Sequence, residues 1–191
     1  MRDGAPDGAL AERMRRWCAG RVWWWRAALF LAVALPVARP LRTEGEWTLF
    51  SGVIFGAHEF GHLFWMPFGE WMGVAGGSLT QLLIPVGAAA LMVRAGDWFG
   101  LSVTGCFLAT SLAELSWYVQ DARAQELPLV SFSEEGAIHD WAYLLDSMGW
   151  LALDARIALM LRAVAWGLLL LSWALALRLC WWMATSAPAT R

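Results

Sequence analysis

The sequence predicts an all-α fold, a polytopic membrane helix bundle with about five transmembrane helices and one interfacial helix. Hydrophobic residues make up 59% of the 191-residue chain, whereas a soluble domain is usually about 45–50% apolar. These residues gather in about five runs that are long enough to be spans. Many of the 15 tryptophans stand at the ends of the runs, and tryptophan favours the headgroup level because its ring is apolar and its N–H is polar.

Residues 1–21 are expected to form a loose, basic N-terminal tail, because glycine, alanine, aspartate and arginine dominate there. The first apolar run, 22–38, is expected to be an uncleaved span that ends at Pro36 and Pro40. A cleaved secretory signal is the alternative, since basic residues precede a short apolar stretch. The stretch before the apolar run is long for a signal, which favours the uncleaved span.

Four further apolar runs predict the remaining spans. They are residues 47–66, 71–93, 98–119 and 157–183. The run 71–93 carries no charged residue, and it is therefore the clearest span among them.

The longest polar segment is 121–147, and part of it, 137–153, predicts an amphipathic helix that lies at the membrane interface. Residues 184–191 are expected to be a short polar tail. The sequence shows no internal repeat, so residues 22–183 are predicted to be a single membrane-embedded domain.

Residues 58–62 read HEFGH, an HExxH motif inside the apolar run 47–66. His58 and His62 are four residues apart, so both imidazoles leave the same face of a helix. This spacing suits two neutral imidazoles that bind one Zn²⁺, and Glu59 is the predicted catalytic base. The alternative is a chance match with the histidines bonded to carbonyl groups. Ionisable side chains are costly inside a bilayer and usually functional, which favours the metal site.

A catalytic zinc takes three protein ligands and keeps an open position, so the motif needs one more ligand. Asp121 is the first candidate, because it continues a polar helix stripe that includes Glu114. The alternative for Asp121 is a helix-end ion pair with Arg123. His139 and Asp140 are the alternative third ligands. They could instead cap a helix or orient a ligating imidazole from behind.

Small and polar residues within 71–93 predict contacts to the site. Gly77, Gln81 and Pro85 are spaced by four, which suits close packing against another helix. Gly77 and Ser78 could offer backbone groups to an unwound substrate strand, and Gln81 either contacts that strand or bonds another helix. Gly77, Ser78 and Gln81 are therefore the predicted substrate-binding residues.

The basic N-terminal segment predicts a cytoplasmic N-terminus. Counting five spans from that end brings all three histidines to the cytoplasmic side of the bilayer. The net charge of −2 gives no indication of nucleic-acid binding. The three cysteines form no CxxC motif, so no thiolate metal site is expected.

Four sequence blocks resemble one family. They are HEFGH (58–62), GGSLTQLLIP (76–85), WYVQDAR (117–123) and HDWAYLL (139–145). HEFGH in a membrane span resembles the HExGH motif of the site-2-protease-like intramembrane zinc metallopeptidases, and the block order is similar to that of small bacterial membrane proteins grouped near them. The resemblance implies zinc ligation by His58 and His62, catalysis by Glu59 and a place in the bacterial inner membrane. In one departure, that family usually takes its third ligand from an Asp-Gly pair, whereas alanine follows Asp121.

The expected function is a zinc-dependent intramembrane metallopeptidase that cleaves a membrane protein or peptide in or near the lipid bilayer. A metal-dependent hydrolase of lipid or another small amphiphile is one alternative, since these residues leave no room for the peptide-binding domain of many family members. The other is a zinc-stabilised, non-catalytic membrane protein, which would surround its metal with four ligands.

Overall fold

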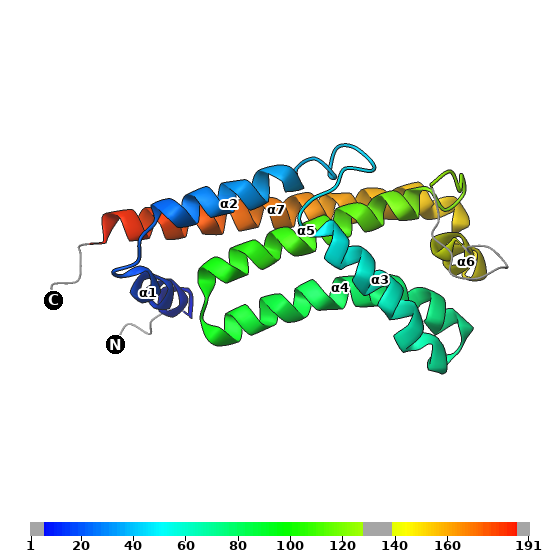
Figure 1. The fold of residues 1–191 in the computed structure, drawn as a ribbon, viewed down its shortest axis with the longest axis horizontal. Coiled ribbons are helices and arrows are strands. Elements are labelled where there is room, and N and C mark those ends of the chain that lie inside the picture. The colour runs from blue at the N-terminus through cyan, green and yellow to red at the C-terminus, as the bar shows by residue number, and fades with distance from the viewer. Residues whose placement is uncertain (1–5, 128–138, 187–191) are drawn as a thin grey trace.

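The computed structural model describes residues 6–127 and 139–186, and every regular element in these residues is a helix. Three long helices run side by side along the longest axis of the molecule (Figure 1). They are α4 (Glu70–Ala95), α5 (Trp98–Gln120) and α7 (Asp154–Thr185), and α5 packs against both of the others. Each is long and apolar enough to cross a bilayer. The predicted all-helical fold is therefore confirmed, and it is compatible with an integral membrane protein.

The predicted number of five spans is not confirmed. Helices α2 (Trp24–Val37) and α3 (Ser51–Trp65) fall within the first two apolar runs, but they contain only 14 and 15 residues. At a rise of 1.5 Å per residue they are about 21–23 Å long, shorter than the bilayer core of about 30 Å. Pro36 occupies the last turn of α2, where its ring and missing N–H favour a helix end.

Residues 6–18, which were expected to be loose, form helix α1 (Pro6–Cys18). Ala11, Met14 and Trp17 pack against the main hydrophobic core, and the Cys18 Sγ donates to the Leu179 carbonyl of α7 at 3.7 Å. The spacing of these side chains is helical, and tertiary contact supplies the stabilisation that a short isolated helix lacks.

The polar segment 121–147 is described only outside residues 128–138. Within the predicted interfacial helix, the structure has α6 (Asp140–Ser147) and a 3-10 turn, η2 (Leu151–Leu153). The last helix, α7, extends into the predicted tail, and residues 187–191 lie outside the described residues.

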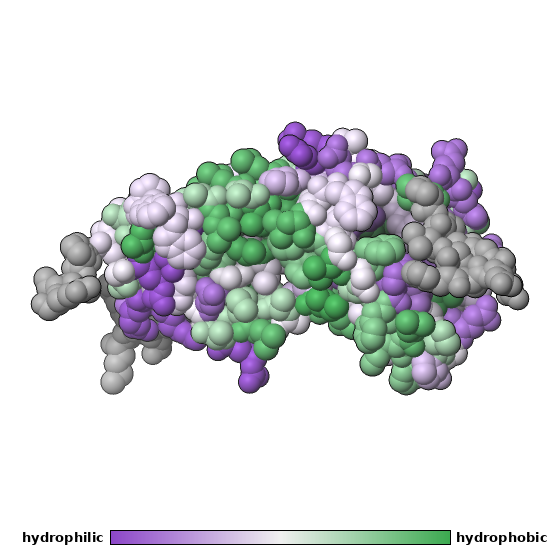
Figure 2. Space-filling model, viewed as in Figure 1, coloured by the Kyte–Doolittle hydropathy of each residue, from purple (hydrophilic) through white to green (hydrophobic). Residues whose placement is uncertain are grey.

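Helices α3 and α4 form a hairpin through the 3-10 turn η1 (Met66–Phe68). Their backbones meet at Gly61 and Gly76, where a Cβ on Gly61 would lie 2.2 Å from the Gly76 carbonyl oxygen. Only glycine permits two backbones to come this close. The face of α3 that carries the histidines therefore packs directly against α4. The outer face of α3 exposes Phe60, Leu63 and Phe64. Figure 2 shows hydrophobic residues over the tip of this hairpin and over the middle of the molecule, as expected for a surface in lipid.

Candidate metal centre

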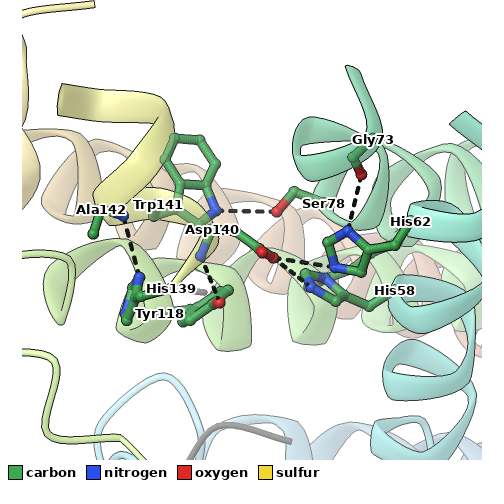
Figure 3. Close-up of polar contacts among 10 residues, drawn as sticks. His58, His62, Gly73, Ser78, Tyr118, His139, Asp140, Trp141 and Ala142 are labelled. Atoms are coloured by element: carbon green, nitrogen blue, oxygen red, sulfur yellow. Dashed lines mark hydrogen bonds and ion pairs between the residues drawn. The ribbon is translucent and has the colours of Figure 1, made fainter. Parts of the chain in front are cut away.

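Two imidazoles and one carboxylate meet where α3, α4 and α6 come together (Figure 3). The Nε2 atoms of His58 and His62 lie 2.9 and 3.2 Å from the same oxygen, Oδ2 of Asp140. Asp140 is buried at the start of α6, and both histidines are half-buried on α3. His58, His62 and Asp140 form a group that could hold a metal ion.

The second ring nitrogen of each histidine has its own acceptor. His62 Nδ1 lies 2.9 Å from the Gly73 carbonyl oxygen, which can only accept. His58 Nδ1 lies 2.9 Å from Gln81 Oε1. The Gln81 amide nitrogen donates to the Ser111 carbonyl at 3.0 Å, so its oxygen is the atom that faces His58. Both Nδ1 atoms therefore carry the ring proton.

This tautomer leaves the lone pair of each Nε2 pointing at the Asp140 carboxylate. Burial raises the pKa of Asp140, but hydrogen bonds from the His58 and His62 rings, when these carry a proton on Nε2, outweigh burial and hold the pKa below its usual value. Asp140 is therefore an anion at neutral pH. Three acceptor atoms then converge on one point, and such a cluster is stable only with protons or a cation between them.

The donor set fits zinc. Two neutral imidazoles and one carboxylate are typical ligands of a catalytic Zn²⁺, and ligand atoms around a tetrahedral zinc are about 3.3 Å apart. The observed separations of 2.9 and 3.2 Å differ from that spacing by only a few tenths of an ångström. The hydrogen bonds of both Nδ1 atoms fix the rings in the orientation that metal-ligating histidines usually have.

Asp140, one of the alternatives, lies with the two histidines in the group that could hold a metal ion, whereas Asp121, the first candidate, lies outside that group. Asp121 caps the end of α5, and its two carboxylate oxygens accept the backbone N–H groups of Glu126 and Leu127 at 2.9 and 3.0 Å. His139 Nε2 lies 3.3 Å from Asp121 Oδ2. Each carboxylate oxygen of Asp121 already accepts a hydrogen bond, so Asp121 stabilises the turn that follows α5.

His139 is the N-cap of α6, as the capping alternative proposed. Its Nδ1 accepts the backbone N–H of Ala142 at 3.2 Å, so the proton of the neutral ring is on Nε2, facing Asp121. Neither ring nitrogen is left for a metal. As the N-cap of α6, His139 therefore holds the turn in which its neighbour Asp140 lies.

Two aromatic residues hold Asp140 against the histidines. The hydroxyl oxygen of Tyr118, on α5, accepts the backbone N–H of Asp140 at 3.0 Å. The indole N–H of Trp141 donates to Ser78 Oγ on α4 at 3.0 Å. Through these contacts α6 is bonded to both α4 and α5 (Figure 3).

The predicted substrate-binding residues lie at the site, but the structure shows contacts within the chain. A Cβ on Gly77 would lie 2.5 Å from His62 Nε2 and 2.8 Å from His58 Nε2, so Gly77 leaves the space beside both ligand atoms open. Ser78 accepts from Trp141, and Gln81 orients His58. The interhelical bond expected for Gln81 is its contact with Ser111 on α5.

Two further acidic residues from the sequence analysis lie on α3 and α5. Glu59 is half-buried on α3, and helix geometry places it about 60° around the axis from His62. Glu114 accepts a hydrogen bond from Ser51 Oγ at 2.5 Å, and it ties the first turn of α3 to α5.

The sequence analysis missed the outer partners of the histidines. The partner of His62 is the backbone carbonyl of Gly73, and a backbone acceptor cannot be recognised from a sequence motif. Tyr118 was not singled out, although it lies in the last turn of α5, close to the candidate ligand Asp121. Comparisons of the chain with protein-family models, curated proteins and solved structures found no match.

Proposed function

We propose that this chain is a membrane-embedded zinc hydrolase whose substrate is a peptide bond in or near the bilayer. One observation carries the proposal: two imidazole lone pairs from an HExxH helix converge with the Asp140 carboxylate at 2.9 and 3.2 Å. His58, His62 and Asp140 would hold the metal. Bound zinc supplies a Lewis acid and lowers the pKa of a coordinated water to about 7.

The ligand set favours a catalytic centre over a purely structural one. Among the described residues the group consists of His58, His62 and Asp140, which leaves one tetrahedral position for water or substrate. Glu59 follows the first ligand directly and is proposed to accept a proton and deliver it to the leaving amine. Gly77 supports the same function, because its missing side chain leaves room beside both Nε2 atoms.

Peptide bonds are favoured over lipid esters because HExxH on a helix, with its glutamate as base, is the arrangement of metallopeptidases. The resemblance to the site-2-protease-like family supports the same choice. A helical substrate has its backbone groups bonded within the helix and must unwind before cleavage.

The test uses detergent-purified protein, a transmembrane peptide and a phospholipid extract, with zinc content measured on the same samples. We expect peptide cleavage that a chelator stops and added zinc restores. Glu59→Gln keeps the wild-type zinc content and lowers the cleavage rate by about 10²–10⁴-fold, the usual contribution of a general base.

Glu70→Gln is the matched control, since Glu70 is an exposed carboxylate at the start of α4, and it should cleave at the wild-type rate. Full activity in Glu59→Gln would rule out Glu59 as the catalytic base. Release of fatty acids without peptide cleavage would establish the lipid alternative instead.

A further inference from the structure

Arginine and tryptophan side chains gather at the end of the bundle farthest from the metal centre. The group, here called the Arg–Trp end, consists of Arg13, Arg15, Arg21, Arg26 and Arg178 with Trp17, Trp25, Trp98 and Trp182. These residues come from α1, the segment after it, and the adjoining ends of α2, α5 and α7. Figure 1 shows α1 at this end of the bundle and α6 at the other.

The guanidinium groups stack on the indole rings. Arg15 and Arg178 both lie over Trp182, with Cζ 5.3 and 4.7 Å from the ring centroid. Arg21 and Arg26 both lie over Trp17, at 4.4 and 5.7 Å. Stacking fixes the plane of a guanidinium and leaves N–H donors at its edge, the geometry that binds phosphate oxygens in pairs.

This positive charge is only partly neutralised by the carboxylates whose side chains the structure describes. The arginine ion pairs among the described residues are Arg16 with Glu12 and Arg123 with Asp154. The carboxylates at the Arg–Trp end whose side chains are described are Glu12 and Asp97, and exposed Arg94 adds a further positive charge. Several guanidinium groups held together repel one another, so an anionic partner stabilises this end.

The other end of the bundle is acidic. It consists of the end of α5, the starts of α4 and α7, and α6. It carries Glu70, Asp121, Glu126, Asp140, Asp146 and Asp154, and its arginines include Arg123, Arg156 and Arg162, which donates to Gln120 Oε1 at the end of α5 at 2.8 Å. The orientation of helices in a membrane follows the arginines, because segments rich in basic residues stay on the cytoplasmic side and acidic residues contribute little.

The path of the chain places the metal centre at the acidic end. Trp25 contacts Phe99 near the start of α5, and the Trp117 indole donates to the Pro40 carbonyl near the end of α5 at 2.6 Å. The segment from α2 to Pro40 therefore runs from the Arg–Trp end to the acidic end. Helix α3 starts midway, with Ser51 bonded to Glu114, and leads to the histidines.

We infer that the Arg–Trp end binds anionic phospholipid headgroups of the cytoplasmic leaflet, so that the metal centre faces the opposite side of the membrane. This reverses the side expected from counting five spans, because α3 does not cross the bilayer on its own. The N-terminus keeps its expected cytoplasmic side. The two tests below measure membrane orientation and lipid binding, and neither depends on catalytic activity.

The first test is labelling of single cysteines with a membrane-impermeant maleimide in bacterial spheroplasts that express the full chain. Asp146→Cys reports on α6, and Ala19→Cys reports on the Arg–Trp end; both positions are exposed. Both variants carry Cys180→Ala, since Cys18 and Cys106 are buried. The labelled residue is identified by peptide mass mapping.

We expect Asp146→Cys to react in intact spheroplasts, and Ala19→Cys to react only after the membrane is permeabilised. The reverse pattern overturns the orientation. Equal labelling of both cysteines before permeabilisation also overturns it, because the two ends would then lie on one side.

The second test is titration of the detergent-solubilised protein with phosphatidylglycerol, phosphatidylcholine and inorganic phosphate. Arg15→Gln is expected to weaken phosphatidylglycerol binding about fivefold, the effect of one basic residue at an anionic surface. Arg42→Gln is the matched control, since Arg42 lies 5.6 Å from the centroid of Trp166 outside the Arg–Trp end, and it should leave the affinity unchanged. The proposed binding of anionic lipid is overturned if phosphatidylcholine binds as tightly as phosphatidylglycerol, or if inorganic phosphate alone binds as tightly.

Discussion

Two groups of histidine and carboxylate lie on either side of Tyr118, and they use the same residue types for different purposes. In one group, His58 and His62 face Asp140; in the other, His139 faces Asp121. The Tyr118 ring lies 5.9 Å from the His58 ring and 4.4 Å from the His139 ring. The two groups are therefore neighbours.

The difference between them is the partner of Nδ1. At His58 and His62 the Nδ1 atoms face acceptors, Gln81 Oε1 and the Gly73 carbonyl, so the Nε2 lone pairs remain. At His139 the Nδ1 atom faces a donor, the Ala142 N–H, so Nε2 carries the proton that Asp121 accepts. The first group can offer its lone pairs to a cation, and the second cannot. The hydrogen-bond partner of Nδ1 therefore decides which histidine could bind a metal.

The largest expected effect is in Asp140→Asn, compared with Asp121→Asn. Asp140→Asn removes the anionic ligand, so the zinc dissociation constant should rise by more than the roughly 10–100-fold that loss of an outer partner causes. Asp121→Asn should keep wild-type zinc stoichiometry, because Asp121 bonds backbone N–H groups and His139. Zinc content after dialysis measures both, and loss of zinc only in Asp121→Asn would reverse the assignment of the two groups.

Gly77→Ala should have the next largest effect. Its Cβ would lie 2.5–2.8 Å from the two Nε2 atoms, so the methyl group must displace the rings or occupy the space of the ion. We expect the zinc content to fall below half while the helical circular dichroism is kept. Gly56→Ala is the control, since no atom lies within 4 Å of its added Cβ; equal zinc content in both variants would contradict the placement of the site.

Gln81→Ala should weaken zinc binding by about 10–100-fold without abolishing it, because it removes the acceptor of the His58 Nδ1–H. Titration with a competing chelator measures this loss. Gln120→Ala is the comparison, as an exposed amide on the same side of the bundle, and its zinc affinity should equal that of the wild type. An unchanged affinity in Gln81→Ala would show that the ring needs no such support.

The smallest effect is expected in His139→Ala, which removes the cap of α6 and keeps all three proposed ligands. A capping side chain contributes about 1 kcal/mol, which corresponds to a fall of about 2–4 °C in the midpoint of thermal unfolding. The zinc content should stay at the wild-type level. Loss of zinc in this variant at temperatures where it remains folded would place His139 in the metal's coordination shell.

The pattern of apolar runs predicted the positions of the long helices well. Residues 71–93, 98–119 and 157–183 all fall within α4, α5 and α7, because a continuous apolar run is stable only as a helix in lipid or in a core. The same pattern does not fix the number of spans, since the runs 22–38 and 47–66 form helices of only 14 and 15 residues. It also missed α1, whose stability comes from contacts with α7.

The candidate site was predictable as far as local spacing reaches. HExxH paired His58 with His62 because four residues make about one helical turn. Asp140 was considered but ranked behind Asp121, since the choice depends on which backbone N–H groups each carboxylate meets. The roles of Gly73, Gln81 and Tyr118 depend on helices that are distant in sequence.

The sequence by itself determined that the chain is apolar and helical, and that two imidazoles leave one face of α3, because both follow from local composition and helix periodicity. Only the tertiary structure decided that Asp140 meets those imidazoles while Asp121 and His139 bond each other. The reason is that the hydrogen-bond partner of a histidine nitrogen decides whether that nitrogen carries the proton. At His58 and His62 that partner comes from α4, and at His139 it is the Ala142 N–H of α6.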